Sequence, residues 1–72
     1  MSDQLDTNAV KIIEIMGVSA KSFDDALDQA VLKASESIKG ISSVEVIGQT
    51  ATVRDAKVTR YETTVKLSFV VR

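Results

Sequence analysis

Cysteine, histidine, tryptophan and proline do not occur in this chain of 72 residues. Without cysteine there is no disulfide, and without cysteine or histidine a structural zinc site lacks its usual ligands. The same absences remove the Ser-His and Cys-His pairs of common hydrolases, so we expect neither an enzyme nor a metal site. A domain this short buries only about 60% of its unfolded surface, and self-association is the remaining common means of stabilising it.

Long apolar runs and basic clusters are absent as well. No run approaches the ~20 apolar residues that span a bilayer, so we expect no membrane partner. Nine basic and ten acidic residues give a net charge of −1, and the basic residues are scattered along the chain. Nucleic-acid binding normally requires a basic face, so we expect no nucleic-acid partner. The first residues, MSDQLDTNAV, lack the basic and apolar regions of a signal peptide, which favours a cytoplasmic location.

The first eight residues are polar without periodicity and are predicted to form a flexible tail. Residues 9–72 contain no repeat or low-complexity tract, so we expect a single domain there. The run AVKIIEIM at residues 9–16 is rich in β-branched residues and is followed by Gly17, which predicts a strand that ends in a turn. Its apolar residues lie on both faces, so we expect this strand to be covered on both sides.

The hydrophobic period changes after this strand. Apolar residues from Phe23 to Ile38 recur at intervals of three and four, which predicts a helix over residues 22–39. Ser22 is the predicted N-cap, and Lys39 followed by Gly40 is a typical helix end. Three of the residues on the apolar stripe are alanines, so this helix is able to lie close to a sheet.

From Val44 the period returns to two, which predicts strands over residues 43–54 and 57–71. The dipeptide Asp55-Ala56 between them is predicted to form a hairpin turn. The helix returns the chain so that the first strand lies beside the third. We therefore expect an α+β fold of βαββ type, with a three-stranded antiparallel sheet in the order 1-3-2.

The predicted helix and sheet differ in length. A helix over residues 22–39 is about 27 Å long at ~1.5 Å per residue, whereas a strand over residues 57–71 extends nearly 50 Å at ~3.3 Å per residue. The chain has no other element to cover the overhang and the two sheet edges, so we expect copies of the chain to cover them. Closed symmetric assembly follows as a prediction.

Two features near the predicted helix start have both a structural and a functional interpretation. The segment GVSAKS at residues 17–22 precedes a helix, as phosphate-binding loops do, but it lacks the second glycine of the G-x-x-x-x-G-K-[ST] pattern. A turn with a helix cap is the simpler interpretation. Asp24, Asp25 and Asp28 lack the spacing of a calcium loop, and compensation of the helix dipole accounts for them.

Three glutamates lie within predicted strands, namely Glu14, Glu45 and Glu62. A glutamate at a sheet or subunit boundary is either a salt-bridge partner or a catalytic acid, since both environments perturb carboxylates. In a chain without histidine or cysteine, the salt-bridge interpretation is favoured.

Four segments together resemble the dodecin family. They are KIIEIMGVS at residues 11–19, SFDDA at residues 22–26, VEV at residues 44–46 and YETTVKLSF at residues 61–69. The resemblance covers nearly the whole chain past residue 9. It implies a protomer whose sheet wraps around its helix, and a hollow sphere of twelve copies, a homododecamer.

The resemblance also implies a ligand of flavin type, namely FMN, FAD or riboflavin. Family members stack the flavin ring on a tryptophan that begins the second strand and bind it with a glutamine of the third strand. The matching positions are Ser43 and Glu62, of which the first offers no ring and the second, when ionised, no donor. We expect the ligand-binding residues to be Ser43, Glu45, Gln49 and Glu62.

Two hypotheses of function follow from the resemblance and its two departures. The first is a cage that binds, stores or sequesters a flavin-type ligand. The second is a cage that has lost flavin binding and holds another ligand, such as a cation or a coenzyme A-like nucleotide, or is purely structural.

Overall fold

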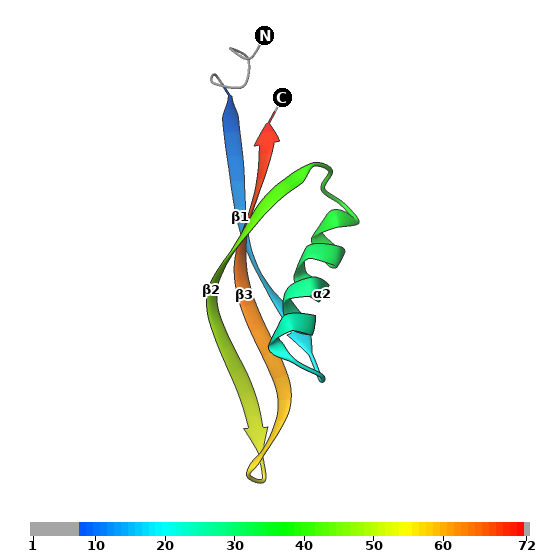
Figure 1. Ribbon diagram of the computed structural model, residues 1–72, viewed down its shortest axis with the longest axis vertical. Helices are drawn as coiled ribbons and strands as arrows, with labels where there is room; N and C mark the ends of the chain where they lie inside the picture. Colours follow the sequence, from blue (N-terminus) through cyan, green and yellow to red (C-terminus); the bar gives the residue numbers. More distant parts are fainter. Residues whose placement is uncertain (1–7, 72) are drawn as a thin grey trace.

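The computed structural model describes residues 8–71 of the chain. Its elements are the strand β1 (Ala9–Ser19), the helix α2 (Phe23–Ser35) and the strands β2 (Ile41–Arg54) and β3 (Lys57–Val71). The strands form one antiparallel sheet with β3 between β1 and β2, and α2 lies across one face of it (Figure 1). The predicted βαββ topology and the order 1-3-2 are therefore confirmed. The tail predicted at residues 1–8 lies outside the described residues, apart from Asn8.

The strand β1 is longer than the sequence pattern indicated. Gly17 does not end it, and β1 continues to Ser19. A Cβ atom at Gly17 would overlap the carbonyl oxygen of Ala26, because the helix backbone lies directly on the strand at this point. Gly17 is therefore required for close packing inside the strand, a common use of glycine where two backbones approach.

The helix α2 begins where the sequence predicted. Ser22 is extended, with φ −168°, and its Oγ accepts a hydrogen bond of 3.0 Å from the backbone N of Asp25. The carboxylate of Asp25 in turn accepts a hydrogen bond of 2.6 Å from Ser19 Oγ. Two side chains thus fix the start of the helix, as capping requires.

The predicted helix end at Lys39 is wrong, because α2 ends at Ser35. The residues that follow, Glu36 and Ser37, donate backbone hydrogen bonds of 3.2 and 3.1 Å to carbonyls three residues earlier, which is a tightened last turn. Serine is a weak helix former, which favours an end here. Gly40 has φ +77° and turns the chain into β2 instead of closing the helix.

The predicted hairpin turn is present at Asp55 and Ala56. Both residues have positive φ angles, 54° and 64°, as in the two-residue turns whose twist matches that of paired strands. Asp tolerates this region well, whereas alanine rarely adopts it.

The core lies between α2 and the centre of the sheet. Its fully buried residues are Ala26, Thr63, Val65 and Leu67, each 0% exposed. Partly buried side chains of β1, α2 and β2 pack around them, among them Ile13, Ile15, Leu27, Val31 and Ile41. The small side chain of Ala26 lets the helix approach the sheet.

The sheet extends beyond the helix at both ends (Figure 1). With 13 residues, α2 is about 20 Å long, whereas the 15 residues of β3 extend about 50 Å. The described residues measure 57 × 21 × 14 Å along their principal axes. On the face of β1 turned away from α2, Val10, Ile12, Met16 and Val18 are 42–59% exposed, and Glu14 lies among them. One protomer therefore does not provide the two-sided cover expected for β1.

Candidate functional site

Three of the four predicted site residues lie on the sheet face turned away from α2. Ser43 pairs with Ser68 and Glu45 pairs with Lys66, and these partners alternate with the buried residues of β3. Glu62 lies on the same face, because it is four positions from Lys66 along β3 and side chains alternate between the faces.

Gln49 lies on the opposite face, beside α2. It pairs with Thr63, which is fully buried under the helix. The cause is a bulge between Val46 and Gly48, which inserts one extra residue and reverses the alternation of β2. Strict alternation would have placed Gln49 with Ser43, so the structure does not bring the four residues to one face.

Ser43 and Glu62 are also far apart within one protomer. The partner of Ser43 is Ser68, six residues from Glu62 along β3, which corresponds to about 20 Å at ~3.3 Å per residue. A single copy of the chain therefore cannot place both side chains against one small ligand.

Glu62 belongs to a polar group that we call the Glu62 network, formed by Thr50, Thr52, Arg60 and Glu62. Thr50 Oγ1 donates to Oε1 of Glu62 at 2.7 Å, and Thr52 Oγ1 donates to Oε2 at 2.6 Å. The Nε of Arg60 also donates to Oε2, at 2.8 Å. Glu62 is only 7% exposed, and its carboxylate accepts all three hydrogen bonds.

These hydrogen bonds keep Glu62 ionised. Those from Thr52, Thr50 and Arg60, in this order of importance, lower the pKa of Glu62 from 4.5 to about 2. Glu62 is thus an acceptor with no donor, and most of its accepting capacity is already used. The interpretation of Glu62 as a salt-bridge partner is confirmed by the ion pair with Arg60.

The Glu62 network depends on the register of β2 and β3. Thr50 pairs with Glu62 and Thr52 with Arg60, so all four side chains share one sheet face. Thr50, Thr52 and Arg60 were not among the predicted site residues. The available signal was the alternation of polar residues in T-A-T at residues 50–52 and R-Y-E at residues 60–62. This alternation shows which side chains share a face, but only the register shows that the two segments lie side by side.

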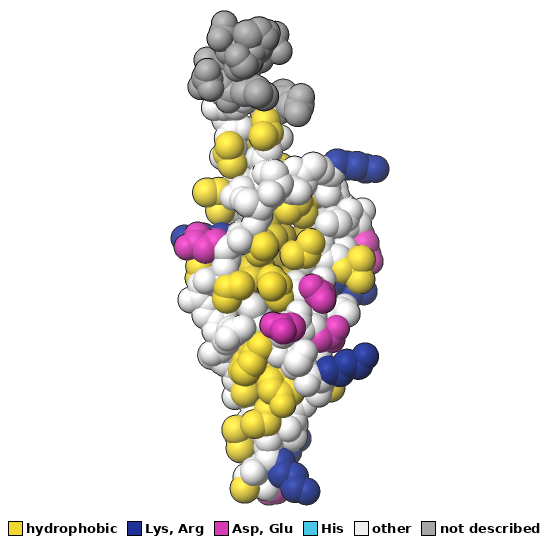
Figure 2. Space-filling model, in the orientation of Figure 1, with side chains coloured by type: hydrophobic (Ala, Val, Ile, Leu, Met, Phe, Trp, Pro, Cys, Tyr) yellow, Lys and Arg dark blue, Asp and Glu magenta, His cyan; other side chains and the backbone are white. Residues whose placement is uncertain are grey.

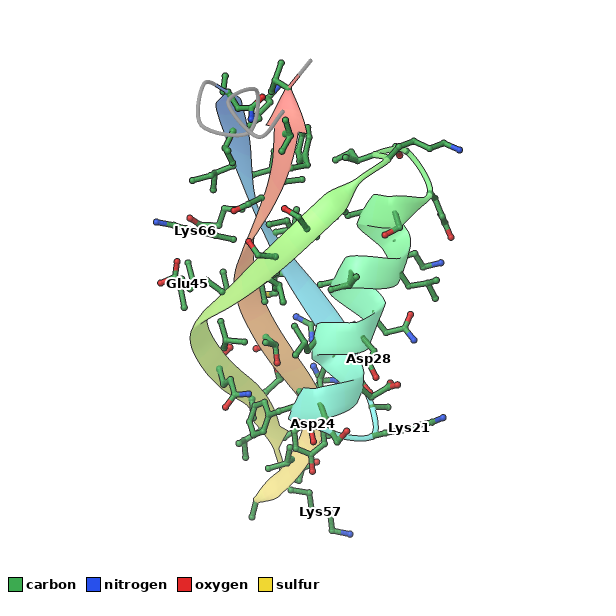
Figure 3. The ribbon with its side chains drawn as sticks, turned by 45° about the horizontal axis from the view of Figure 1, so that its top comes forward. Lys21, Asp24, Asp28, Glu45, Lys57 and Lys66 are labelled. Atoms are coloured by element: carbon green, nitrogen blue, oxygen red, sulfur yellow. The ribbon has the colours of Figure 1, made fainter. Side chains whose placement is uncertain are left out.

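Glu14, Lys66 and Glu45 form a charged row across the three strands on the same face. Lys66 pairs with Glu14 on one side and with Glu45 on the other. Figure 3 shows Glu45 and Lys66 projecting from the same side of the sheet. Within residues 8–71 no group of three acidic, histidine or cysteine side chains is arranged to hold a metal ion.

The start of α2 is a cap in this structure. Ser19 Oγ accepts hydrogen bonds from the backbone N of Lys21 at 2.9 Å and of Ser22 at 3.4 Å. Together with the N–H of Asp25, which Ser22 Oγ accepts, three backbone N–H groups around the helix start are paired within the chain, which supports the turn-and-cap interpretation. Asp24 and Asp28 project from the first turns of α2, as Figure 3 shows.

Three open grooves lie beside the helix. The first, of about 520 Å³, runs between β1 and α2 and is mainly apolar, with Ile13, Ile15 and Ile38 in its wall. The second, of about 500 Å³, lies on the other side of α2. Ser43 lines a third groove of about 210 Å³. None of the three contains Glu45, Gln49 or Glu62.

The chain also contains no helix, within the described residues, with the length and apolarity that crossing a membrane requires. The surface in Figure 2 is a mixture of hydrophobic patches and charged side chains of both signs.

Comparison with known proteins gives a family. The model of the dodecin family matches residues 9–72. The dodecin of Streptomyces coelicolor is 25% identical, with a TM-score of 0.87 over 90% of this chain and 93% of that chain. The dodecin of Streptomyces davaonensis is 20% identical, with a TM-score of 0.86 over 90% and 96% of the two chains.

A third similar structure is that of a protein that binds calcium. It is the calcium dodecin of Mycobacterium tuberculosis, described as a calcium-chelating immunodominant antigen with a calcium-binding site. It is 33% identical, with a TM-score of 0.80 over 89% of this chain and 91% of that chain. No match was found among curated proteins. With 64 consecutive residues matched by the family model, this chain belongs to the dodecin family.

Proposed function

We propose that this protein binds and stores or sequesters a small ligand as a hollow homododecamer, and that it is not an enzyme. The observation that carries the proposal is the uncovered sheet. Apart from Glu14, the outward residues of β1 are apolar and exposed, with Val10 at 55% and Ile12 at 59%. A large exposed apolar surface is a mark of an interface, and a closed symmetric assembly covers it without leaving an open end.

The sheet edges support the same assembly. β1 and β2 are both edge strands, and each is long, with 11 and 14 residues. A long edge with unpaired backbone groups invites pairing with other chains unless it is covered. Neighbouring copies provide this cover, while the single helix of each protomer covers only the centre of its own sheet.

The ligand pocket is proposed to lie between copies. Because Ser43 and Glu62 are about 20 Å apart in one protomer, a small ligand contacts both only when they come from different copies. Glu45 lies on the same face as Ser43, so the copy that supplies Ser43 also supplies Glu45. Gln49 lies on the other sheet face and reaches such a pocket only from a further copy.

A flavin-type ligand is the first candidate, because of the family. The two departures from the family pattern favour the second candidate, a cage that holds another ligand. Ser43 gives no aromatic surface for stacking, which contributes about 0.5–1.5 kcal/mol per ring pair. The carboxylate of Glu62 has no donor for a carbonyl oxygen, and three donors of its own chain already occupy it.

A cation or a coenzyme A-like nucleotide is the alternative ligand. The 33% identical calcium dodecin supports a cation. A calcium ion needs six to eight oxygen ligands, and no suitable acidic group exists within residues 8–71 of one copy. A calcium site is therefore proposed only between copies, where carboxylates such as Glu14 and Glu45 come together.

Native mass spectrometry of the untreated protein tests the assembly and the ligand together. We expect a species of twelve times the 7.8 kDa protomer mass, without bound flavin. A monomer at micromolar concentration would overturn the cage. Stoichiometric flavin, or strong quenching of added riboflavin fluorescence, would overturn the second candidate and support the first.

A calcium titration separates the alternatives within the second candidate. Isothermal calorimetry with calcium chloride, with magnesium chloride as the control, is expected to show binding that disappears in the Glu45→Gln variant. Equal heats for both ions would argue against a calcium site.

We propose a cytoplasmic location for the protein, which fractionation of the source cells would test.

A further inference from the structure

Arg60 has hydrogen-bonding groups that the protein does not use. Its Nε donates to Glu62 Oε2 at 2.8 Å, and among the described residues this is the one hydrogen bond or ion pair of the guanidinium. A guanidinium has five N–H donors, so the two terminal amino groups keep four without a partner. The side chain is 53% exposed, and these groups are open to a ligand.

The guanidinium is also fixed in direction. Its partner Glu62 is anchored by Thr50 Oγ1 at 2.7 Å and Thr52 Oγ1 at 2.6 Å, and it is only 7% exposed. Surface arginines usually lose rotamer freedom when they bind, which weakens binding. Because an anchored carboxylate already holds Arg60, much of that loss has occurred before any ligand arrives.

The surroundings of Arg60 favour an anion. The end of the β2–β3 hairpin, residues 54–60, contains Arg54, Lys57 and Arg60 against one carboxylate, that of Asp55, although the whole chain has a net charge of −1. Figure 2 shows basic side chains at this end of the molecule, and Figure 3 places Lys57 there. The negative charge of Glu62 is engaged by its three hydrogen-bond donors.

We propose that the terminal amino groups of Arg60 bind a phosphoryl group of a small ligand, with Glu62 as the positioning residue. Arginine suits this role because its planar fork matches two phosphate oxygens at once. The proposal rests on the proposed function only in requiring a small ligand. It requires neither a flavin nor a particular number of copies.

Calorimetry with inorganic pyrophosphate, at ionic strength held constant with sodium chloride, tests this proposal. The Arg60→Gln variant is expected to bind at least about tenfold more weakly than the unaltered protein, and Arg60→Lys is not expected to restore binding, since an ammonium lacks the fork. Lys39→Gln, which removes an exposed basic side chain from outside the hairpin, is the control, and it is expected to bind within about twofold of the unaltered protein. Equal losses in Lys39→Gln and Arg60→Gln, or no binding by the unaltered protein, would overturn the proposal.

The role of Glu62 requires a separate measurement. In Glu62→Gln we expect pyrophosphate binding to weaken, and the NMR signal of the Arg60 Nε–H, distinct in the unaltered protein, to merge with those of free arginines. A preserved Nε–H signal with unchanged binding would refute the positioning role. If Glu62→Gln does not fold, Thr52→Val, which removes one donor from the carboxylate, gives the same two readouts.

Native mass spectrometry of the same variants distinguishes this proposal from the cage. If the unaltered protein is not a dodecamer yet Arg60-dependent pyrophosphate binding persists, the cage fails and the anion site stands. If Arg60→Gln breaks the assembly in parallel with binding, Arg60 serves the contact between copies and the anion site is overturned.

Discussion

The two halves of β3 are stabilised in different ways. The C-terminal half lies under α2, where Val65 and Leu67 are completely buried and packed against Ala30. The N-terminal half belongs to the hairpin that extends past the helix, and there the Glu62 network links β2 to β3 with charged and hydroxyl groups. One strand thus uses apolar packing where a helix covers it and charge-assisted hydrogen bonds where none does.

The border between the halves is the first turn of α2. The rings of Phe23 and Tyr61 meet edge to face, with their centroids 5.0 Å apart. Thr63 Oγ1 donates to the carbonyl oxygen of Phe23 at 3.0 Å. Packing against the helix therefore ends near this turn, and the Glu62 network begins one residue away along β3, on the opposite face of the sheet.

The largest effect is expected from a change at the point where α2 lies on β1. In Gly17→Val the added side chain would overlap the backbone carbonyl of Ala26, so we expect a loss of more than about 3 kcal/mol and failure to fold. Circular dichroism and thermal unfolding measure this. Gly48→Val is the control, because nothing lies within 4 Å of a Cβ there. Equal behaviour of the two variants would contradict close packing at Gly17.

A cavity under the helix is expected to have the next largest effect. Leu67→Ala should cost about 2–5 kcal/mol, because Leu67 is 0% exposed and the helix above it has little freedom to move inward. Val58→Ala in the uncovered half is the matched change, and with Val58 48% exposed we expect less than about 1 kcal/mol. Urea unfolding gives both values. A larger cost for Val58 than for Leu67 would reverse the comparison of the two halves.

Much of this fold could be predicted from the sequence. The change of hydrophobic period from two to 3.6 and back located all four elements, and Asp55-Ala56 located the hairpin turn. The helix end was overestimated because Ile38 continues the apolar stripe after the backbone has left the helix. Ile38 lies in the turn after the helix and lines the groove beside β1. Periodicity alone does not distinguish an apolar residue of a helix from one of the turn that follows it.

The candidate site was less predictable, because it depends on register. The bulge between Val46 and Gly48 moves Gln49 to the helix side. The available signal was Gly48, because an isolated glycine inside a strand often marks a bulge. The Glu62 network joins residues 10 and 12 positions apart across a hairpin, so only the pairing shows that they meet. The pattern of apolar residues therefore predicts the core of the protein. Predicting the polar contacts also requires the register in which the strands pair.

Acid is expected to weaken the uncovered half before it affects packing under the helix. The pKa of Glu62 is lowered from 4.5 to about 2 in the folded protein, mainly by Thr52 and Thr50, so the unfolded chain takes up this proton more readily than the folded one. The contribution of Glu62 is fully present above about pH 4.5 and is lost as the pH falls toward 2. Thermal unfolding of the unaltered protein and of Glu62→Gln from pH 7 to 2.5 measures this contribution as the difference between their Tm values, because the other carboxylates are common to both. A constant difference in Tm across this range would contradict the prediction.

The smallest effect is expected at the tip of the hairpin, where the uncovered half has a strained residue. Ala56 has φ +64°, a region that costs a residue with a Cβ about 1–2 kcal/mol, whereas glycine adopts it freely. Glycine also adds entropy to the unfolded chain, which offsets part of the gain. We therefore expect Ala56→Gly to stabilise the protein by no more than about 1 kcal/mol, measured by urea unfolding. Ala51→Gly, in the paired part of β2, is the control and is expected to destabilise, so stabilisation by both would show that the hairpin tip is not strained.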